Sequence, residues 1–408
     1  MAIKPELRLT DQQRFDWLRL VRSENVGPRT FRALVTNFGG ARAALNALPA
    51  LARRGGASRE IRVASIEEIE KELIAARKLG VRFIALGEPD YPSALREIDS
   101  APPILALRGQ AEGLRKAAVA IVGSRNASAA GLTFAERLAR GLGQAGYVIV
   151  SGLARGIDQR AHLASLETGA VGVLAGGHGK PYPGDAVPLM ERMVESGAIL
   201  SEMPIEWEPR GRDFPRRNRI VSGLALGVVV VEAARGSGSL ITARFALDQN
   251  RQVFAVPGSP LDPRAEGTND LLKQGASICT GPDDVLTALE PVRSSDDLAA
   301  LREAGGEPGE PLWGEQALYG VDPESTPRTQ PGDEFEDMSG APYRSGGEAQ
   351  AARERIIALL GPSPITLDEL ARAAEAPARA VRVALLELEL AGRVEYSGDR
   401  VALRAIAD

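Results

Sequence analysis

The chain has 408 residues and a formal net charge of −5, with 44% apolar and 25% charged residues. Because one ordinary hydrophobic core does not grow to that size, we expect two or three domains of a globular protein. The sequence has no run of about 18 apolar residues and no signal-peptide core, which argues against membrane insertion and export, so we expect a cytoplasmic protein. A single cysteine, Cys279, excludes an intramolecular disulfide and a thiolate metal cage.

Residues 1–112 form the first predicted domain, which is helical. Apolar residues recur at helical spacing in 12–20, and a turn at 25–30 precedes a second apolar helix that stops at Gly39-Gly40. The pattern resembles a SAM or helix-hairpin-helix unit, in which a glycine turn lets backbone amides approach a phosphate. A packing or protein-interaction module is the alternative interpretation.

Residues 113–290 are predicted to form an α/β domain, because short apolar runs alternate here with helical stretches. Continuous Val, Ile and Ala runs that end in Gly, Ser or Pro are typical of parallel strands buried on both faces. We therefore predict a Rossmann-like, doubly wound parallel sheet. Its expected strands are residues 118–122, 147–150, 170–174, 198–201, 227–232 and 252–256.

Residues 291–349 are predicted to be a flexible acidic linker, because they are rich in Pro, Gly, Ser, Asp and Glu. Between residues 290 and 348, fourteen acidic residues stand against four arginines, so this segment carries −10 and the remainder about +5. Exposed charges farther apart than about 8 Å are largely screened at physiological salt. The acidic segment therefore does not cancel a basic groove elsewhere.

Residues 350–408 are predicted to form a winged-helix domain of three helices and a hairpin. Duplex reading needs basic residues on the third helix, yet this helix carries Glu387 and Glu389 beside Arg379 and Arg382. That balance favours a protein-contact module over a duplex-reading one.

Glycine and arginine gather in the loops that follow the predicted strands, where a doubly wound sheet binds its ligands. Glycine turns expose backbone amides to an anion, hydroxyl groups and helix N-termini add donors, and arginine forks match phosphate oxygens. The sequence therefore predicts a phosphate-binding rim for nucleic acid or a nucleotide. Its candidate residues are Ser124, Arg125, Arg155, Gly156, Lys180, Tyr182, Arg216, Arg217, Asn218, Arg219, Ser237, Gly238, Ser239 and Thr242. In this set, Tyr182 either stacks on an unpaired base or packs between its neighbouring prolines.

Other ligand and enzyme classes have weaker support. The loop at 123–126 is not the G-x-G-x-x-G of a dinucleotide site, and no P-loop motif occurs. His162 is expected to pack on a helix, and His178, in a glycine loop, either packs or contacts ligand. Asp158 is expected to cap a helix rather than act as a base. No nucleophile is paired with a base and no metal-ligand motif occurs, so we predict binding without catalysis, cofactor or metal.

Ordered motifs along the α/β domain carry a resemblance to a known family. They lie at residues 120–125, 150–158, 214–223, 230–233, 237–243, 253–258 and 267–269, and continue at 90–95 and 102–109 in the first domain. In these motifs the chain resembles the DNA-processing protein A family (DprA/Smf).

The resemblance implies single-stranded DNA bound in a basic pocket of the Rossmann-like domain. It also implies a homodimer that protects incoming DNA and loads the RecA recombinase in natural transformation and recombination, without ATP hydrolysis. The family's Gly-Ser-Arg motif assigns Arg125 to the DNA, and its glycine-rich loop assigns Lys180 and Tyr182. This loop departs from the family pattern, because residues 176–181 are richer in glycine and include His178. No motif assigns residues to the dimer or RecA surfaces.

Two rival interpretations remain open. The same sheet resembles nucleotide phosphoribohydrolases, which cleave the N-glycosidic bond of nucleoside monophosphates. The loop at 234–242, however, lacks the carboxylate of their Pro-Gly-Gly-x-Gly-Thr-x-x-Glu motif. A transcription factor led by the winged helix would need tight duplex binding by residues 350–408, which the mixed charge of the third helix disfavours.

Overall fold

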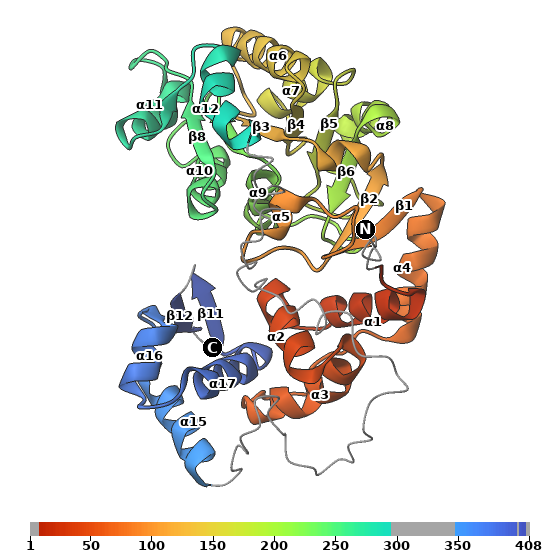
Figure 1. Ribbon diagram of the computed structural model, residues 1–408, viewed down its shortest axis with the longest axis vertical. Coiled ribbons are helices and arrows are strands. Elements are labelled where there is room, and N and C mark those ends of the chain that lie inside the picture. The colour runs from red at the N-terminus through yellow and green to blue at the C-terminus, as the bar shows by residue number, and fades with distance from the viewer. Residues whose placement is uncertain (1–7, 295–346, 398–399, 405–408) are drawn as a thin grey trace, which may run out of the picture. The chain divides into compact units, whose positions relative to one another are not determined.

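The computed structural model describes residues 8–294, 347–397 and 400–404 (Figure 1). Most of the predicted linker, 291–349, lies outside these ranges. The chain divides into two units, one combining Met1–Leu9 with Glu67–Glu310 and the other combining Thr10–Ile66 with Pro311–Asp408. Within the described ranges, no helix combines the length and apolarity needed to span a bilayer.

The first unit is built on a nine-stranded sheet with the order β1-β2-β6-β5-β4-β3-β7-β8-β9. The strands from β6 across to β9 pair in parallel, whereas β1 and β2 pair antiparallel. Every residue of β3 is buried, as expected for a central strand covered on both faces. The predicted Rossmann-like sheet is confirmed. Its strands are β1 (Val81–Ala85), β2 (Ile104–Gly109), β3 (Ala118–Val122), β4 (Val148–Ser151), β5 (Ala170–Val173), β6 (Ala198–Ser201), β7 (Gly227–Val230), β8 (Gln252–Ala255) and β9 (Ser277–Ile278).

Two groups of helices pack on this sheet. The helices α6 (Ala129–Gln144), α7 (Ile157–Ala164) and α12 (Pro282–Ser294) enclose an apolar core together with side chains of the central strands. The helices α9 (Asp213–Gly223) and α10 (Gly238–Asp248) pack on each other, α9 also against β5 and α10 against β7 and β8. The remaining elements are α4 (Ile66–Lys78), α5 (Ser93–Arg96), α8 (Val187–Ser196), α11 (Glu266–Lys273), η1 (Glu112–Arg115), η2 (Gly184–Ala186) and η3 (Pro263–Ala265).

The sheet begins earlier in the chain than the sequence predicts. Both β1 and β2 fall within residues 1–112, which the sequence assigns to the helical domain. In the structure β2 pairs with β6, with Ala106 opposite Ser201 and Gly109 opposite Ala198. A lone two-stranded hairpin is marginally stable in water, and pairing with β6 supplies the third strand that such a hairpin needs. Residues 81–109 therefore belong to the sheet unit.

The helical part of the second unit consists of α1 (Asp11–Arg22), α2 (Pro28–Phe38) and α3 (Ala41–Arg54). A capping box between Thr10 and Gln13 starts α1. Trp17 is buried and meets Phe31 edge-on, with ring centroids 4.8 Å apart. Asn25 turns the chain between α1 and α2 at a φ of 58°, a left-handed conformation that Asn tolerates. This arrangement agrees with the predicted helix-hairpin-helix type of domain.

The C-terminal part of the second unit has the winged-helix arrangement that the sequence predicts. Its short sheet has the order β10-β12-β11, and a compact apolar core joins this sheet to the three helices. A second capping box, between Thr366 and Glu369, starts the middle helix. The elements are α15 (Gly347–Leu359), β10 (Ile365–Thr366), α16 (Leu367–Ala373), α17 (Ala378–Leu390), β11 (Val394–Ser397) and β12 (Arg400–Leu403).

Replacing Phe254 with Ala should destabilise the sheet unit. Phe254 lies on β8, is fully buried and belongs to the core beneath α6 and α12, so its removal leaves a cavity that costs about 3–5 kcal/mol. Chemical denaturation followed by circular dichroism should show the lower midpoint. In the control Leu261→Ala, the side chain is 93% exposed, so the free energy of unfolding should change by less than about 0.5 kcal/mol. Equal midpoints for the two variants would contradict the core position of Phe254.

Candidate nucleic-acid interface

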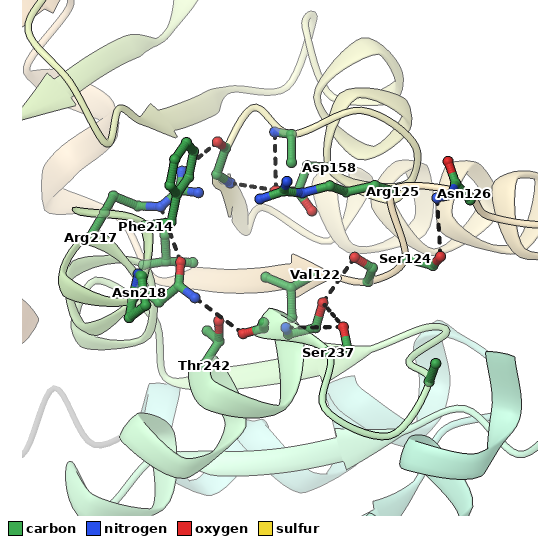
Figure 2. A pocket seen from close by; sticks show the side chains of 18 residues that line it. Val122, Ser124, Arg125, Asn126, Asp158, Phe214, Arg217, Asn218, Ser237 and Thr242 are labelled. Carbon is green, nitrogen blue, oxygen red and sulfur yellow. Dashed lines mark hydrogen bonds between the residues drawn. The ribbon is translucent and has the colours of Figure 1, made fainter. Parts of the chain in front are cut away.

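A cavity of about 310 Å³ opens where the strand order of the sheet reverses. From β3 the sheet continues to β4, β5 and β6 on one side and to β7, β8 and β9 on the other. The loops after β3 and β7 therefore run apart, and a doubly wound sheet binds ligands in the crevice left between them. Figure 2 shows this pocket, which is lined by residues that follow β3, β4 and β7 and by one face of α9.

The N-terminus of α10 forms one wall of the pocket. Ser237 caps this helix and accepts a hydrogen bond from the backbone of Ser239. The Ser239 hydroxyl donates to the carbonyl of Gly123 at 2.9 Å, which ties this wall to the loop after β3. Thr242 and Gly238 complete this part of the lining. A helix N-terminus with unpaired amides and a positive dipole end favours an anion.

The loop after β3 forms the opposite wall, and glycines allow it to pack closely. A Cβ on Gly123 would lie 2.6 Å from the side chain of Ile157, at the start of α7. Gly156 has a φ of +80°, and a Cβ there would lie 2.3 Å from the carbonyl oxygen of Ser124. Gly156 thus supports the loop from behind rather than lining the pocket. Ser124 itself lines the pocket and accepts a hydrogen bond from the backbone of Asn126 at 3.1 Å.

One face of α9 forms the third wall. Phe214, Arg217, Asn218 and Val221 all line the pocket, and they stand at positions i, i+3, i+4 and i+7 of the helix. Asn218 donates to the carbonyl of Gly238 at 3.2 Å, which joins α9 to the start of α10. Of the four consecutive polar residues at 216–219, only Arg217 and Asn218 line the pocket, because they lie on this face of the helix.

Arg125 is the exposed cation of the pocket. Its guanidinium carbon lies 5.4 Å from the ring centroid of Phe214, within the range of a cation–π contact. No salt bridge holds this side chain among the residues that the structure describes. Figure 2 shows Arg125 extending from the β3 loop across the pocket. Its charge is therefore available to a ligand.

Arg217 and Asp158 form the buried floor of the pocket. The Arg217 guanidinium donates to the carbonyl groups of Gly152 and Val173, and Asp158 accepts from the backbone of Gly152 at 3.1 Å. Burial lowers the pKa of Arg217 to about 10, with Arg125 acting in the same direction and Asp158 against it. Burial likewise raises the pKa of Asp158, and Arg217 opposes that shift. The expected helix cap is wrong, because α7 begins after Gly156 without any side-chain cap. Asp158 instead accepts from the backbone of Gly152 and Ala154, and these contacts hold the loop after β4 in place.

Arg216 and Arg219 lie on the other side of α9, away from the pocket lining. Both face Glu202, with Arg216 Nε 3.0 Å and an Arg219 terminal nitrogen 2.5 Å from its carboxylate oxygens. The side chains of Arg219 and Glu202 are 8% and 7% exposed, so this is a buried ion pair. The sequence groups all the arginines of 216–219 at one ligand, but successive residues of an α-helix point about 100° apart. Arg219 is therefore a structural residue in this conformation.

The other predicted cations also lie outside the pocket lining. Arg155 forms an ion pair with Asp185 at 2.8 Å, and Lys180 is exposed. Tyr182 is 51% exposed and meets Phe214 edge-on, with ring centroids 5.4 Å apart. It therefore does not pack away between its neighbouring prolines. Phe214, which lines the pocket, therefore contacts both Tyr182 and Arg125.

Neither histidine lines the pocket. His162 on α7 is fully buried, and burial lowers its pKa to about 3. His178 is also buried, with Nε2 3.1 Å from the carbonyl of Ala106, and burial lowers its pKa to about 4. Burial raises the pKa of the Cys279 thiol to about 12. In the described part of the chain, no group of three His, Cys, Asp or Glu residues could hold a metal ion.

Phe214 is one of several pocket residues that the predicted set omits; Asn126 and Val221 are others. Phe214 stands inside the motif at 214–223, but it carries no charge and the predicted set holds only charged and polar residues of that motif. Helical spacing from Arg217 and Asn218 was the signal that could have found it, since a residue three or four positions earlier shares their face.

Comparison with known proteins assigns the family. A family model described as DNA recombination-mediator protein A matches residues 82–290, which is half of the chain. The chain belongs to this family. Models of a DprA-like N-terminal HHH domain and a DprA winged helix domain match residues 11–75 and 340–399. All the motifs quoted for the resemblance lie within the first match.

Individual members of the DNA recombination-mediator protein A family cover much of the chain. The DNA processing protein DprA of Bacillus subtilis is 41% identical over 225 residues, 54% of this chain and 76% of that protein. Protein Smf of Synechocystis is 31% identical over 319 residues, 77% of each. The crystal structure of DprA from Streptococcus pneumoniae, 31% identical, superposes with a TM-score of 0.57 over 69% of this chain and 98% of that one.

Arg219→Met should lower stability, whereas Arg125→Met should not. Breaking a buried ion pair on one side costs about 3–5 kcal/mol, and Arg216 remains near Glu202, so we expect a loss of about 3 kcal/mol. Arg125 is exposed, so its replacement should change the free energy of unfolding by less than about 0.5 kcal/mol. Urea denaturation of the two variants measures the difference. A stable Arg219→Met variant would show that the pair with Glu202 is dispensable.

Proposed function

We propose that this chain binds single-stranded DNA, with the sugar-phosphate backbone in the pocket between β3 and β7. We further propose that it protects the strand and passes it to the RecA recombinase, without ATP hydrolysis. Membership of the DNA recombination-mediator protein A family supports a role in DNA processing. The observation that carries the proposal for the pocket is that Arg125 and Phe214 line it together with the N-terminus of α10, while Tyr182 contacts Phe214.

The two walls of the pocket suit a phosphate. The capped start of α10 and the loop at 123–126 supply backbone amides and hydroxyl groups, and Arg125 supplies an uncompensated charge. Arg217 adds a second positive charge in the pocket floor, close enough to Arg125 to depress its own pKa. An anion between the two guanidinium groups relieves that repulsion. A phosphodiester is the anion that a polynucleotide offers.

The aromatic side chains favour an unpaired strand over a duplex. Base–aromatic stacking needs a base whose face is open, and each such contact contributes about 1–3 kcal/mol. Tyr182 is half exposed, and its contact with Phe214 extends the aromatic surface into the pocket. A duplex keeps its bases stacked on one another and offers no face to this surface.

The enzymatic alternative has less support from the pocket. A phosphoribohydrolase needs a carboxylate aimed at the glycosidic bond, and Asp158 is the one carboxylate among the residues that line this cavity. It is buried, accepts backbone hydrogen bonds from Gly152 and Ala154, and faces Arg217. The loop at 234–242 brings serine, glycine and threonine to the pocket. Binding therefore remains the better proposal, and the homodimer and RecA surfaces remain without assigned residues.

Arg125→Ala should weaken the binding of single-stranded DNA by about tenfold, because a charge-assisted hydrogen bond contributes about 1.5–3 kcal/mol. The loss should be similar for all base sequences, and the slope of log K against log salt should become shallower by about 0.7. Fluorescence anisotropy with a labelled oligonucleotide at several salt concentrations measures both quantities. Arg192→Ala, an exposed arginine on α8, is the matched control and should bind as the unaltered chain does. Equal losses for the two variants would point to a diffuse electrostatic effect instead of the pocket.

Tyr182→Ala should weaken binding to an ordinary oligonucleotide about five- to tenfold, and binding to an abasic strand of the same length hardly at all. The reason is that stacking needs a base, whereas phosphate contacts do not. The same anisotropy experiment with the two strands separates these contributions. An equal loss of affinity for both strands would contradict the stacking role of Tyr182. It would not bear on the proposed phosphate contacts of Arg125.

A further inference from the structure

The helix α17 of the winged-helix domain is buried on two faces. Val381, Ala384, Leu385 and Leu388 pack into the core of this domain. Leu386 and Leu390 are not part of that core, yet they are 5% and 1% exposed. Leucines buried outside this core need another surface to cover them, so a second element must contact the C-terminal half of α17.

The covering surface is the helical part of the same unit, because α17 packs against α2 and α3 (Figure 1). The side-chain amide of Asn25 donates to the carbonyl of Leu390 at 2.9 Å, at the open end of α17. The guanidinium of Arg29 lies 5.6 Å from the ring centroid of Tyr396 on β11. These contacts join the turn between α1 and α2 to the end of α17 and to the wing.

Glu387 lies between the two domains. Its side chain is 5% exposed and lies 3.0 Å from Arg54 at the end of α3 and 3.0 Å from Arg353 on α15. A buried carboxylate is costly unless its partners compensate the lost hydration. Arg353 belongs to the winged-helix domain itself, whereas Arg54 comes from the helical domain. The contact with the helical domain thus explains why a glutamate, Glu387, stands on a buried side of α17.

Gly55, which follows α3, allows the backbones of the helical domain and of α17 to approach each other closely. Its φ of −65° is an ordinary helical value that any residue adopts. A Cβ at this position would nevertheless lie 1.9 Å from the carbonyl oxygen of Glu387 and 3.0 Å from the Cβ of Ala391. The nearest atoms all belong to the winged-helix domain. Glycine is therefore required here by the approach of α17 and not by the local conformation.

We propose that α17 is a docking helix for the helical domain of its own chain. Proteins of the winged-helix class read duplex DNA with this third helix. In this chain the C-terminal half of that helix is occupied by α2 and α3, and Glu387 is buried there between two arginines, so this half of the helix is not open to a duplex. The two domains therefore act as one module, independently of the proposed single-strand site in the other unit.

The test measures how fast the Glu387 carboxylate is labelled by a carbodiimide and an amine in the full chain. Gly55→Ser and Asn25→Asp both change the helical domain alone: the first inserts atoms against Glu387, and the second replaces a donor by an acceptor opposite Leu390. Each should speed labelling of Glu387 by at least about tenfold, the change expected when a closed interface opens. Gly27→Ser is the matched control, because nothing lies within 4 Å of the added Cβ. Glu395, which is exposed on β11, is the internal reference and should label equally in all variants.

Three results would overturn the assignment. The first is Glu387 labelling as fast in the unaltered chain as in Gly55→Ser. The second is labelling of the unaltered chain that accelerates on dilution, which would make a second copy the occupant. The third is acceleration by a short DNA duplex, which would mean that α17 exchanges the helical domain for DNA. Amide exchange in the β11–β12 hairpin should stay slow in Gly55→Ser, which separates undocking from unfolding of the winged helix.

Discussion

The pocket in the α/β unit depends on the reversal of strand order between β3 and β7. Two parallel strands that lie side by side send their chains to opposite sides of the sheet, so their loops separate and leave a crevice at the carboxyl edge. The start of α10 and the β3 loop face each other across this crevice and supply hydrogen-bond donors without needing any charged side chain. Arg125 and Arg217 then add charge to a site whose shape the backbone has already set.

The rotation of α9 decides what each arginine of 216–219 does. Arg217 and Asn218 share a face with Phe214 and turn toward the pocket, whereas Arg216 and Arg219 turn toward Glu202. The same short motif therefore performs two tasks. One face lines the pocket, and the other anchors the helix through a buried ion pair. A substitution in this motif can alter the pocket or weaken the anchoring of α9, so stability has to be measured beside the proposed DNA binding.

The second unit illustrates a different use of a nucleic-acid-binding fold. Its winged helix has the expected helices and strands, but the side chains of α17 suit a protein neighbour: leucines on a second face and a carboxylate between Arg54 and Arg353. Fold alone does not decide whether such a domain reads DNA. The side chains on the third-helix face outside the domain core decide whether the domain can read DNA. Here α2 and α3 cover that face in the C-terminal half of α17.

The sequence by itself determined the α/β sheet, the helical and winged-helix domains and several of the loops that line the pocket, because periodicity, capping boxes and glycine turns are local properties. It also supplied Ser124, Arg125, Arg217, Asn218, Ser237, Gly238, Ser239 and Thr242, which the structure brings to one cavity. Only the tertiary structure decided that β1 and β2 join the sheet, since strand pairing depends on a distant edge at β6. It alone decided that Arg155 and Arg219 have carboxylate partners and that Glu387 is buried. The two partners of an ion pair can lie far apart in the chain. The local sequence around a charged residue therefore does not show whether its side chain faces solvent or a partner of opposite charge.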